Sequence, residues 1–163
     1  MLCLVSFIFL ASSTSNYIEF FRALEQFTLK LRDVDLVVGQ KNATIGMTFE
    51  MCNPTSYVGF NLREWSYRLI LKASNQTIDL SYDTISYAEK PITISPQWNK
   101  TFEQHTYLDI TKPTSSRFMA LYQLYQLNQG KEITWTLEVG VVLLNPLTSH
   151  IDIPLTSSLK SRL

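Results

Sequence analysis

Apolar and polar residues alternate with a period of two through most of the chain after Phe27. This alternation is typical of β-strands that bury one face. The clearest predicted strand covers 43–52, and its inward set is Ala43, Ile45, Met47, Phe49 and Met51. The same pattern predicts three more strands, with the inward sets Ile133, Trp135, Leu137, Val139, Val141 and Leu143; Trp65, Tyr67, Leu69, Leu71 and Ala73; and Ile78, Leu80 and Tyr82. Weaker strands are expected over 92–95, 101–110 and 150–155.

The alternation changes phase at two places. Its inward residues are first Phe27, Leu29 and Leu31, and then Val34, Leu36 and Val38. A β-bulge near Arg32 and Asp33 would keep both sets inward. The same slip separates Val58, Phe60 and Leu62 from Trp65 and Tyr67.

One segment breaks the period of two. After Pro113, Thr114 or Ser115 can cap a helix whose shared face is Phe118, Leu121, Tyr122 and Tyr125, and Gly130 is placed to end it. Turn residues bracket the strands on either side. The pattern therefore predicts an all-β, antiparallel sandwich of about seven strands, with one short helix before the last long strand.

The N-terminus differs from the rest of the chain. Leu2 to Ala11 is an uncharged apolar run that ends at a polar stretch beginning with Ser12. A run of this length is shorter than the about 20 residues that cross a bilayer, but it suits the core of a secretory signal. No Lys or Arg precedes Arg22, so residues 1–15 are read as a signal peptide or as the end of a membrane anchor. A buried N-terminal strand or helix is the remaining interpretation.

An apolar stripe follows over residues 16–26, which we interpret as an amphipathic stem. Its members are Tyr17, Phe20, Phe21 and Leu24, continued by Phe27. The stripe would either pack on the domain or lie at a membrane surface.

Composition narrows the classes of function. The 163 residues are enough for one domain, and 14 basic side chains balance 14 acidic ones. A chain without net positive charge has no field that draws it to a phosphate backbone, so we expect no nucleic-acid partner. The two cysteines, Cys3 and Cys52, lie far apart, and Cys52 is read as a buried or half-buried hydrophobe.

Residues for catalysis or cofactor binding do not cluster in the sequence. His105 and His150 have no neighbouring metal ligands, and the glycines are scattered rather than grouped before a helix. No serine stands in a strand-turn-helix elbow. We therefore expect no catalytic residues, no metal and no cofactor, and we predict that the protein is not an enzyme. His105 is expected to face solvent on a strand.

Three sequons, at Asn42, Asn75 and Asn99, are candidate N-glycosylation sites. They are expected at strand ends or turns. Together with the apolar N-terminus they favour a location on the extracytoplasmic side of a membrane.

The stretch 44–73 resembles a known family. A strand ending in Asn53, Pro54 and Thr55, followed at once by 58–62 and the next strand, is similar to the late embryogenesis abundant (LEA) type-2 or water-stress and hypersensitive-response domain. The resemblance covers about residues 28–156, within an expected domain of 27–159. It implies a fibronectin-III/immunoglobulin-like sandwich without catalytic residues, often behind one membrane anchor and linked to stress or desiccation tolerance.

The leading functional hypothesis is a non-catalytic binding or protective module, membrane-anchored or secreted, that meets its partners through hydrated faces. The first alternative is a lipid-binding domain that holds an acyl chain along Met47, Met51, Phe60 and Tyr122. The second alternative is a surface adhesin or filament subunit that binds other surface proteins.

Overall fold

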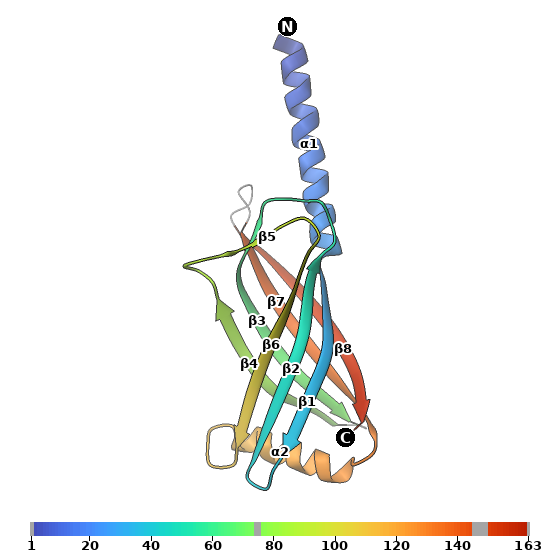
Figure 1. The fold of residues 1–163 in the computed structure, drawn as a ribbon, viewed down its shortest axis with the longest axis vertical. Helices are drawn as coiled ribbons and strands as arrows, with labels where there is room; N and C mark the ends of the chain where they lie inside the picture. The colour runs from blue at the N-terminus through green and yellow to red at the C-terminus, as the bar shows by residue number, and fades with distance from the viewer. Residues whose placement is uncertain (1, 74–75, 145–149, 163) are drawn as a thin grey trace.

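A computed structural model describes residues 2–73, 76–144 and 150–162, with side chains placed from Ser12 onward. A long helix rises from one end of a β-sandwich, and a second helix lies across the other end (Figure 1). In chain order the elements are α1 (Leu2–Gln26), β1 (Thr28–Val38), β2 (Asn42–Asn53), β3 (Phe60–Ala73), β4 (Gln76–Ser86), β5 (Ile92–Ile94), β6 (Trp98–Asp109), α2 (Ser115–Leu127), β7 (Glu132–Leu144) and β8 (Ile151–Arg162).

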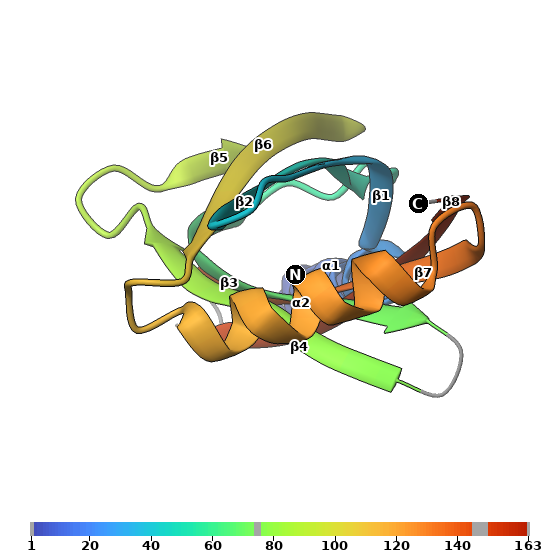
Figure 2. The ribbon, with the colours of Figure 1, turned by 90° about the horizontal axis from the view of Figure 1, so that it is seen from below.

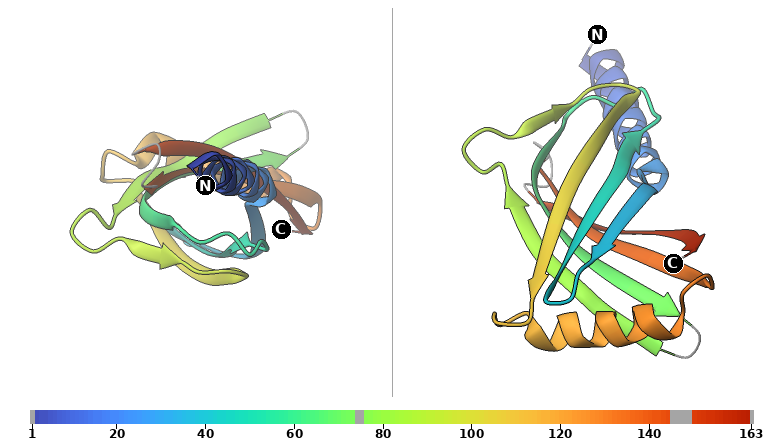
Figure 3. Two further views of the ribbon diagram at one scale, coloured as in Figure 1. Left: turned by 90° about the horizontal axis from the view of Figure 1, so that it is seen from above. Right: turned by 60° about the horizontal axis from the view of Figure 1, so that its bottom comes forward.

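The strands form two antiparallel sheets that face each other (Figure 3). The first sheet has the order β1-β2-β6. The second has the order β4-β3-β7-β8, and the short β5 also pairs with β3. The predicted all-β sandwich is confirmed, with eight strands in the described residues.

The core lies between the sheets and contains the aromatic and aliphatic residues expected there. Trp65 on β3 is fully buried, and its ring meets Phe49 of the opposite sheet edge-on at 5.1 Å between centroids. The predicted core set is at most 3% exposed: Ile45, Met47, Phe49, Trp65, Tyr67, Leu69, Trp135, Leu137 and Val139. Burial of this apolar surface is the main contribution to folding.

Both predicted phase changes are confirmed as irregularities of register. One lies between Leu31 and Asp33 on β1, and the other lies between Leu62 and Glu64 on β3. Val58 was expected to face inward, but this is wrong, because it lies before β3 begins and is 66% exposed.

A third irregularity, which the sequence pattern did not predict, reverses the phase of β4. Leu69 pairs with Ser81 while Ile70 pairs with Asp79, so Leu80 is an extra residue on β4. As a result Ser81 is 4% exposed and Tyr82 is 65% exposed. The predicted inward position of Tyr82 is therefore wrong, and Ser81 takes the core-facing place.

The C-terminal strands are longer than predicted. β8 continues to Arg162 rather than ending near Leu155, so two long strands follow α2. Among the described strands β3, with 14 residues, is slightly longer than β7, with 13.

Helix α2 is confirmed within the predicted segment, and it crosses the end of the sandwich opposite α1 (Figure 2). Its buried residues are Phe118, Leu121 and Leu124, whereas Tyr122 and Tyr125 are only half buried. Asn128 then donates a side-chain hydrogen bond to the Leu124 carbonyl (2.8 Å), which satisfies one carbonyl of the last turn.

Helix α1 runs without a break through the apolar run and the predicted stem. Phe20 and Ala23 are at most 1% exposed and join the core. Tyr17 and Phe21 are about half exposed, so only part of the predicted stripe packs on the domain. Within residues 2–73, 76–144 and 150–162, no helix is long and apolar enough to cross a membrane.

Candidate functional site

The Asn53-Pro54-Thr55 segment forms a tight turn at the end of β2. Asn53 Oδ1 accepts hydrogen bonds from the Thr55 amide (3.2 Å) and the Thr55 hydroxyl (2.7 Å). Thr55 Oγ1 in turn accepts one from the Tyr57 amide (3.3 Å). Asn53 is fully buried, so this geometry is that of an Asx turn that redirects the chain toward β3. In this structure the motif has a structural role. The Thr55 hydroxyl takes part in the turn, because it both donates to Asn53 and accepts from Tyr57.

The four residues considered for lipid contact do not gather at one place. Met47, Met51 and Phe60 are at most 3% exposed within the filled core. Phe60 packs against Phe20 of α1 (5.6 Å between ring centroids), whereas Tyr122 packs against Phe118 of α2 (5.9 Å). These two helices lie at opposite ends of the sandwich (Figure 1).

Two of the three sequons lie in the described residues. Asn42 is the first residue of β2 and is exposed, and its Nδ2 donates to the Tyr107 hydroxyl (3.1 Å). Asn99 is the second residue of β6 and is also exposed. Asn75 lies outside the described residues.

The outer faces of both sheets carry ion pairs. Arg32 pairs with Glu50 on the first sheet. Arg68 on the second sheet contacts Asp79 (2.8 Å) and Glu138 (3.6 Å). The hydrogen bond from Arg32 lowers the pKa of Glu50, and the hydrogen bond to Asp79 raises the pKa of Arg68.

His105 lies exposed on β6, as predicted. It borders a shallow hollow of about 270 Å³ on the outer face of the first sheet, beside Asp35 and Glu103. The ring lies over Gly46, where an added Cβ would come within 3.3 Å of Nδ1. Among the described residues, no three His, Cys, Asp or Glu side chains are arranged to hold a metal ion. Cys52 is a half-buried free thiol.

A second hollow, of about 210 Å³, lies where β4 of one sheet faces β6 of the other. We call this side of the sandwich the open edge. Ser81 and Asp83 of β4 line the hollow together with Tyr67, and the first turn of α2 contributes Arg117. Burial raises the pKa of the Tyr67 phenol, and the Asp83 carboxylate adds to this effect.

Sequence reasoning missed the hollow at the open edge. The extra residue Leu80 turns Ser81 and Asp83 toward the side of β4 that faces the core, opposite Leu69 and Tyr67. Polar residues on that side of a strand are the available signal, but the signal is visible only once the bulge is known.

Comparisons with known proteins bear on the fold alone. No protein-family model and no curated protein matches this sequence. A solution structure from Arabidopsis thaliana is similar, with 15% identity over 82% of this chain and 79% of that chain and a TM-score of 0.53. A protein assigned provisionally to the late embryogenesis abundant (LEA) proteins has 17% identity over 99% of this chain and 84% of that one, with a TM-score of 0.44. A protein from Archaeoglobus fulgidus has 11% identity over 82% and 98%, with a TM-score of 0.41. The first of these supports the sandwich fold found here.

Proposed function

We propose that this protein is a non-catalytic, LEA type-2-like β-sandwich that binds or protects partner molecules through its hydrated outer faces. The observation that carries the proposal is the division of the strands on both sheets into a more buried, apolar side and a less buried, largely polar side. The sequence resemblance at Asn53, Pro54 and Thr55 supports the family assignment. The same resemblance suggests the link to water stress.

The charge pattern of the outer faces fits a protective role. The basic and acidic side chains balance, and in the described residues Arg32, Arg68 and Lys160 pair with acidic side chains across strands. Such a surface has no strong attraction for a particular charge sign. Its hydroxyl and carboxylate groups can replace some hydrogen bonds that a partner loses when water is removed.

A drying assay tests the protective role. A labile enzyme such as lactate dehydrogenase is dried with the protein and rehydrated, and its remaining activity is compared with that after drying with an equal mass of albumin. Thr84→Val with Thr156→Val removes two exposed hydroxyls from the second sheet while keeping β-branched side chains. Thr84→Ser with Thr156→Ser keeps the hydroxyls and is the matched control. We expect protection to fall only with the valine pair, and protection no better than albumin would contradict the proposal.

We also propose that the domain lies on the extracytoplasmic side of a membrane, attached or released through residues 1–15. The apolar run from Leu2 to Ala11 and the exposed sequon at Asn42 support this location. Cell fractionation with N-terminal sequencing tests it. A mature start near Ser13 indicates secretion, and an intact Met1 in the membrane fraction indicates an anchor. An intact Met1 in the soluble cytosol would overturn the proposal, and with it the expected glycosylation.

A further inference from the structure

The hollow at the open edge is lined by polar residues at core-facing positions of β4. On most of β2, β3 and β7 the core-facing side is apolar. On β4 the core-facing positions opposite Leu69 and Tyr67 are Ser81 and Asp83. A polar, partly buried opening therefore separates β4 from β6 where a closed sandwich would have apolar contact.

Ser81 shows that this opening has unused hydrogen-bonding capacity. The residue is 4% exposed and lines the hollow. Its hydroxyl contacts the Tyr67 phenol and works against the rise in the pKa of that phenol, but this contact falls short of a well-formed hydrogen bond, and Oγ has no other partner among the described residues. A buried hydroxyl without a well-formed hydrogen bond is destabilising, and a polar occupant of the hollow would offset that cost.

Two opposite charges, both on exposed side chains, face the same hollow, and the His105 ring also lines it. Asp83 accepts a hydrogen bond from the Thr84 amide (2.8 Å), but it has no cationic partner in the described part of the chain. Arg117, in the first turn of the 13-residue α2, makes no ion pair among the same residues. The partial positive charge of a helix N-terminus adds to that of Arg117. Leu80 and Leu108 supply apolar side chains to the lining of the hollow.

We propose that the open edge binds a small zwitterion of the amino-acid or betaine class. The carboxylate of the ligand lies toward Arg117 and the first turn of α2, and its ammonium lies toward Asp83. A bare anion would meet Asp83, and a bare cation would meet Arg117, so a molecule with both charges is the complementary occupant. The volume of about 210 Å³ is below that of sites for drug-sized molecules, which restricts the ligand to small metabolites. This inference goes beyond the proposed protective role and does not depend on it.

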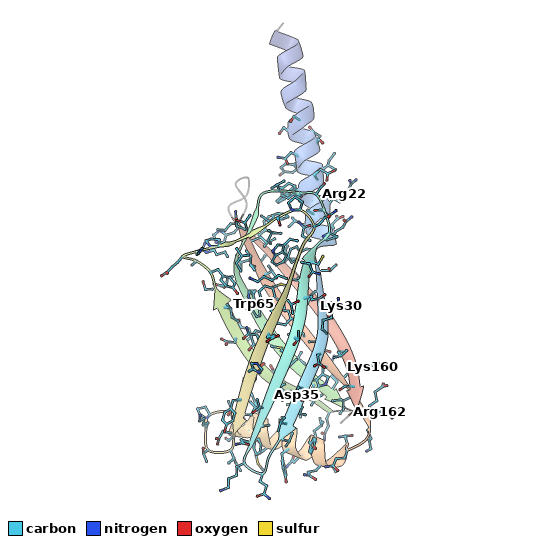
Figure 4. The ribbon with its side chains drawn as sticks, viewed as in Figure 1. Arg22, Lys30, Asp35, Trp65, Lys160 and Arg162 are labelled. Atoms are coloured by element: carbon cyan, nitrogen blue, oxygen red, sulfur yellow. The ribbon has the colours of Figure 1, made fainter. Side chains whose placement is uncertain are left out.

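Titration of the ¹⁵N-labelled full chain with trimethylglycine tests the proposal by NMR. At constant ionic strength we expect saturable shifts confined to amides of β4, β6 and the start of α2. Asp83→Asn and Arg117→Gln should each weaken binding about five-fold or more. Arg162→Gln is the matched control and should change binding less than two-fold, because Arg162 lies at the end of β8 on the other side of the sandwich (Figure 4).

The two halves of the ligand provide the second comparison. Tetramethylammonium chloride and sodium acetate each carry one of its charges, and we expect each to bind about five-fold or more weakly. Shifts that spread over the whole chain and rise linearly would indicate general solvent exclusion and would overturn the proposal. Unchanged binding by both variants, or equal binding of either half-ligand, would also overturn it.

Discussion

The two long sides of the sandwich are built differently. On one side β1 lies against β8, and we call this the closed edge (Figure 1). The Leu31 amide crosses between the sheets there and donates to Ser157 Oγ (2.9 Å). On the other side β4 and β6 leave the hollow that contains Ser81 and Asp83.

Both edges place serine on the core-facing side of an edge strand, so the difference lies in what the serine meets. On β8, Ser157 accepts from the Leu31 amide, and Ser161 accepts from Trp135 Nε1 (2.9 Å). On β4, Ser81 is more deeply buried but lacks such a bond among the described residues. The comparison shows that a core-facing serine in an edge strand can have two effects. It links the two sheets when it hydrogen-bonds to the opposite sheet, and it lines a polar hollow when it does not.

The largest expected effect comes from breaking the core beside the closed edge. Trp135 on β7 is 1% exposed and also bonds Ser161. We expect Trp135→Ala to lower the free energy of unfolding by about 3–5 kcal/mol, measured by urea denaturation, because it leaves a cavity. Trp98→Ala is the control and should cost less, since Trp98 is only half buried. Equal losses would contradict this assignment of the core.

The second effect tests the bond across the closed edge. Ser157→Ala removes the acceptor of the Leu31 amide and leaves a partly buried donor unpaired. We expect the free energy of unfolding to fall by about 1–2 kcal/mol in the same urea assay. Ser158→Ala changes the same residue type one position along β8 on the exposed side, where it loses a side-chain hydrogen bond with Thr136 Oγ1 (3.3 Å) but strands no backbone amide, and it should cost less. No difference between the two variants would mean that the cross-sheet bond does not stabilise the fold.

The same substitution at the open edge should behave differently. Ser81→Ala removes a buried hydroxyl that has no well-formed hydrogen bond in the described residues. We expect a change in the free energy of unfolding within about 0.5 kcal/mol, and in the stabilising direction if the hollow is empty. A loss as large as that of Ser157→Ala would show that Ser81 is as well paired as the serines of the closed edge.

The period-two pattern predicted the centre of the fold better than its edges. Strands β2, β3 and β7 each have a sheet neighbour on both sides and an opposing sheet to pack on, so their apolar residues mostly recur at every second position, apart from the phase change on β3 between Leu62 and Glu64. The bulge near Arg32 was predictable because it leaves apolar residues on both sides of the slip. The bulge at Leu80 leaves a polar residue, Ser81, on the buried side, so the alternation gave no sign of it.

The structure of the two edges depends on contacts between residues that are distant in the sequence. The predicted strand stopped near Leu155, before the polar stretch Thr156 to Ser158. In the structure Ser157 accepts a hydrogen bond from the amide of Leu31 on β1, which is 126 positions earlier in the chain. The hollow likewise joins Tyr67, Ser81 and Arg117 from three different elements. No local pattern contains this information.

The last expected effect is absent at neutral pH, appears only at alkaline pH, and concerns Tyr67 at the open edge. Burial, together with the nearby Asp83 carboxylate, raises the pKa of its phenol above the ordinary value of 10.0. The folded protein therefore holds this proton more tightly than the unfolded chain does. Its contribution to stability is complete below about pH 10 and is lost as the pH rises toward the folded-state pKa.

Urea denaturation of the wild type between pH 8 and 11 should therefore show stability that falls with pH, and Tyr67→Phe should reduce that slope. One group can contribute at most about 1.4 kcal/mol per pH unit. Tyr82→Phe leaves Tyr67 in place and should keep the wild-type slope. Because Asp83 contributes to the shift, Asp83→Asn should also reduce the alkaline slope, though less than Tyr67→Phe does. A slope that is the same in the wild type and Tyr67→Phe would mean that water reaches the phenol freely, and that the open edge is less enclosed than its geometry indicates.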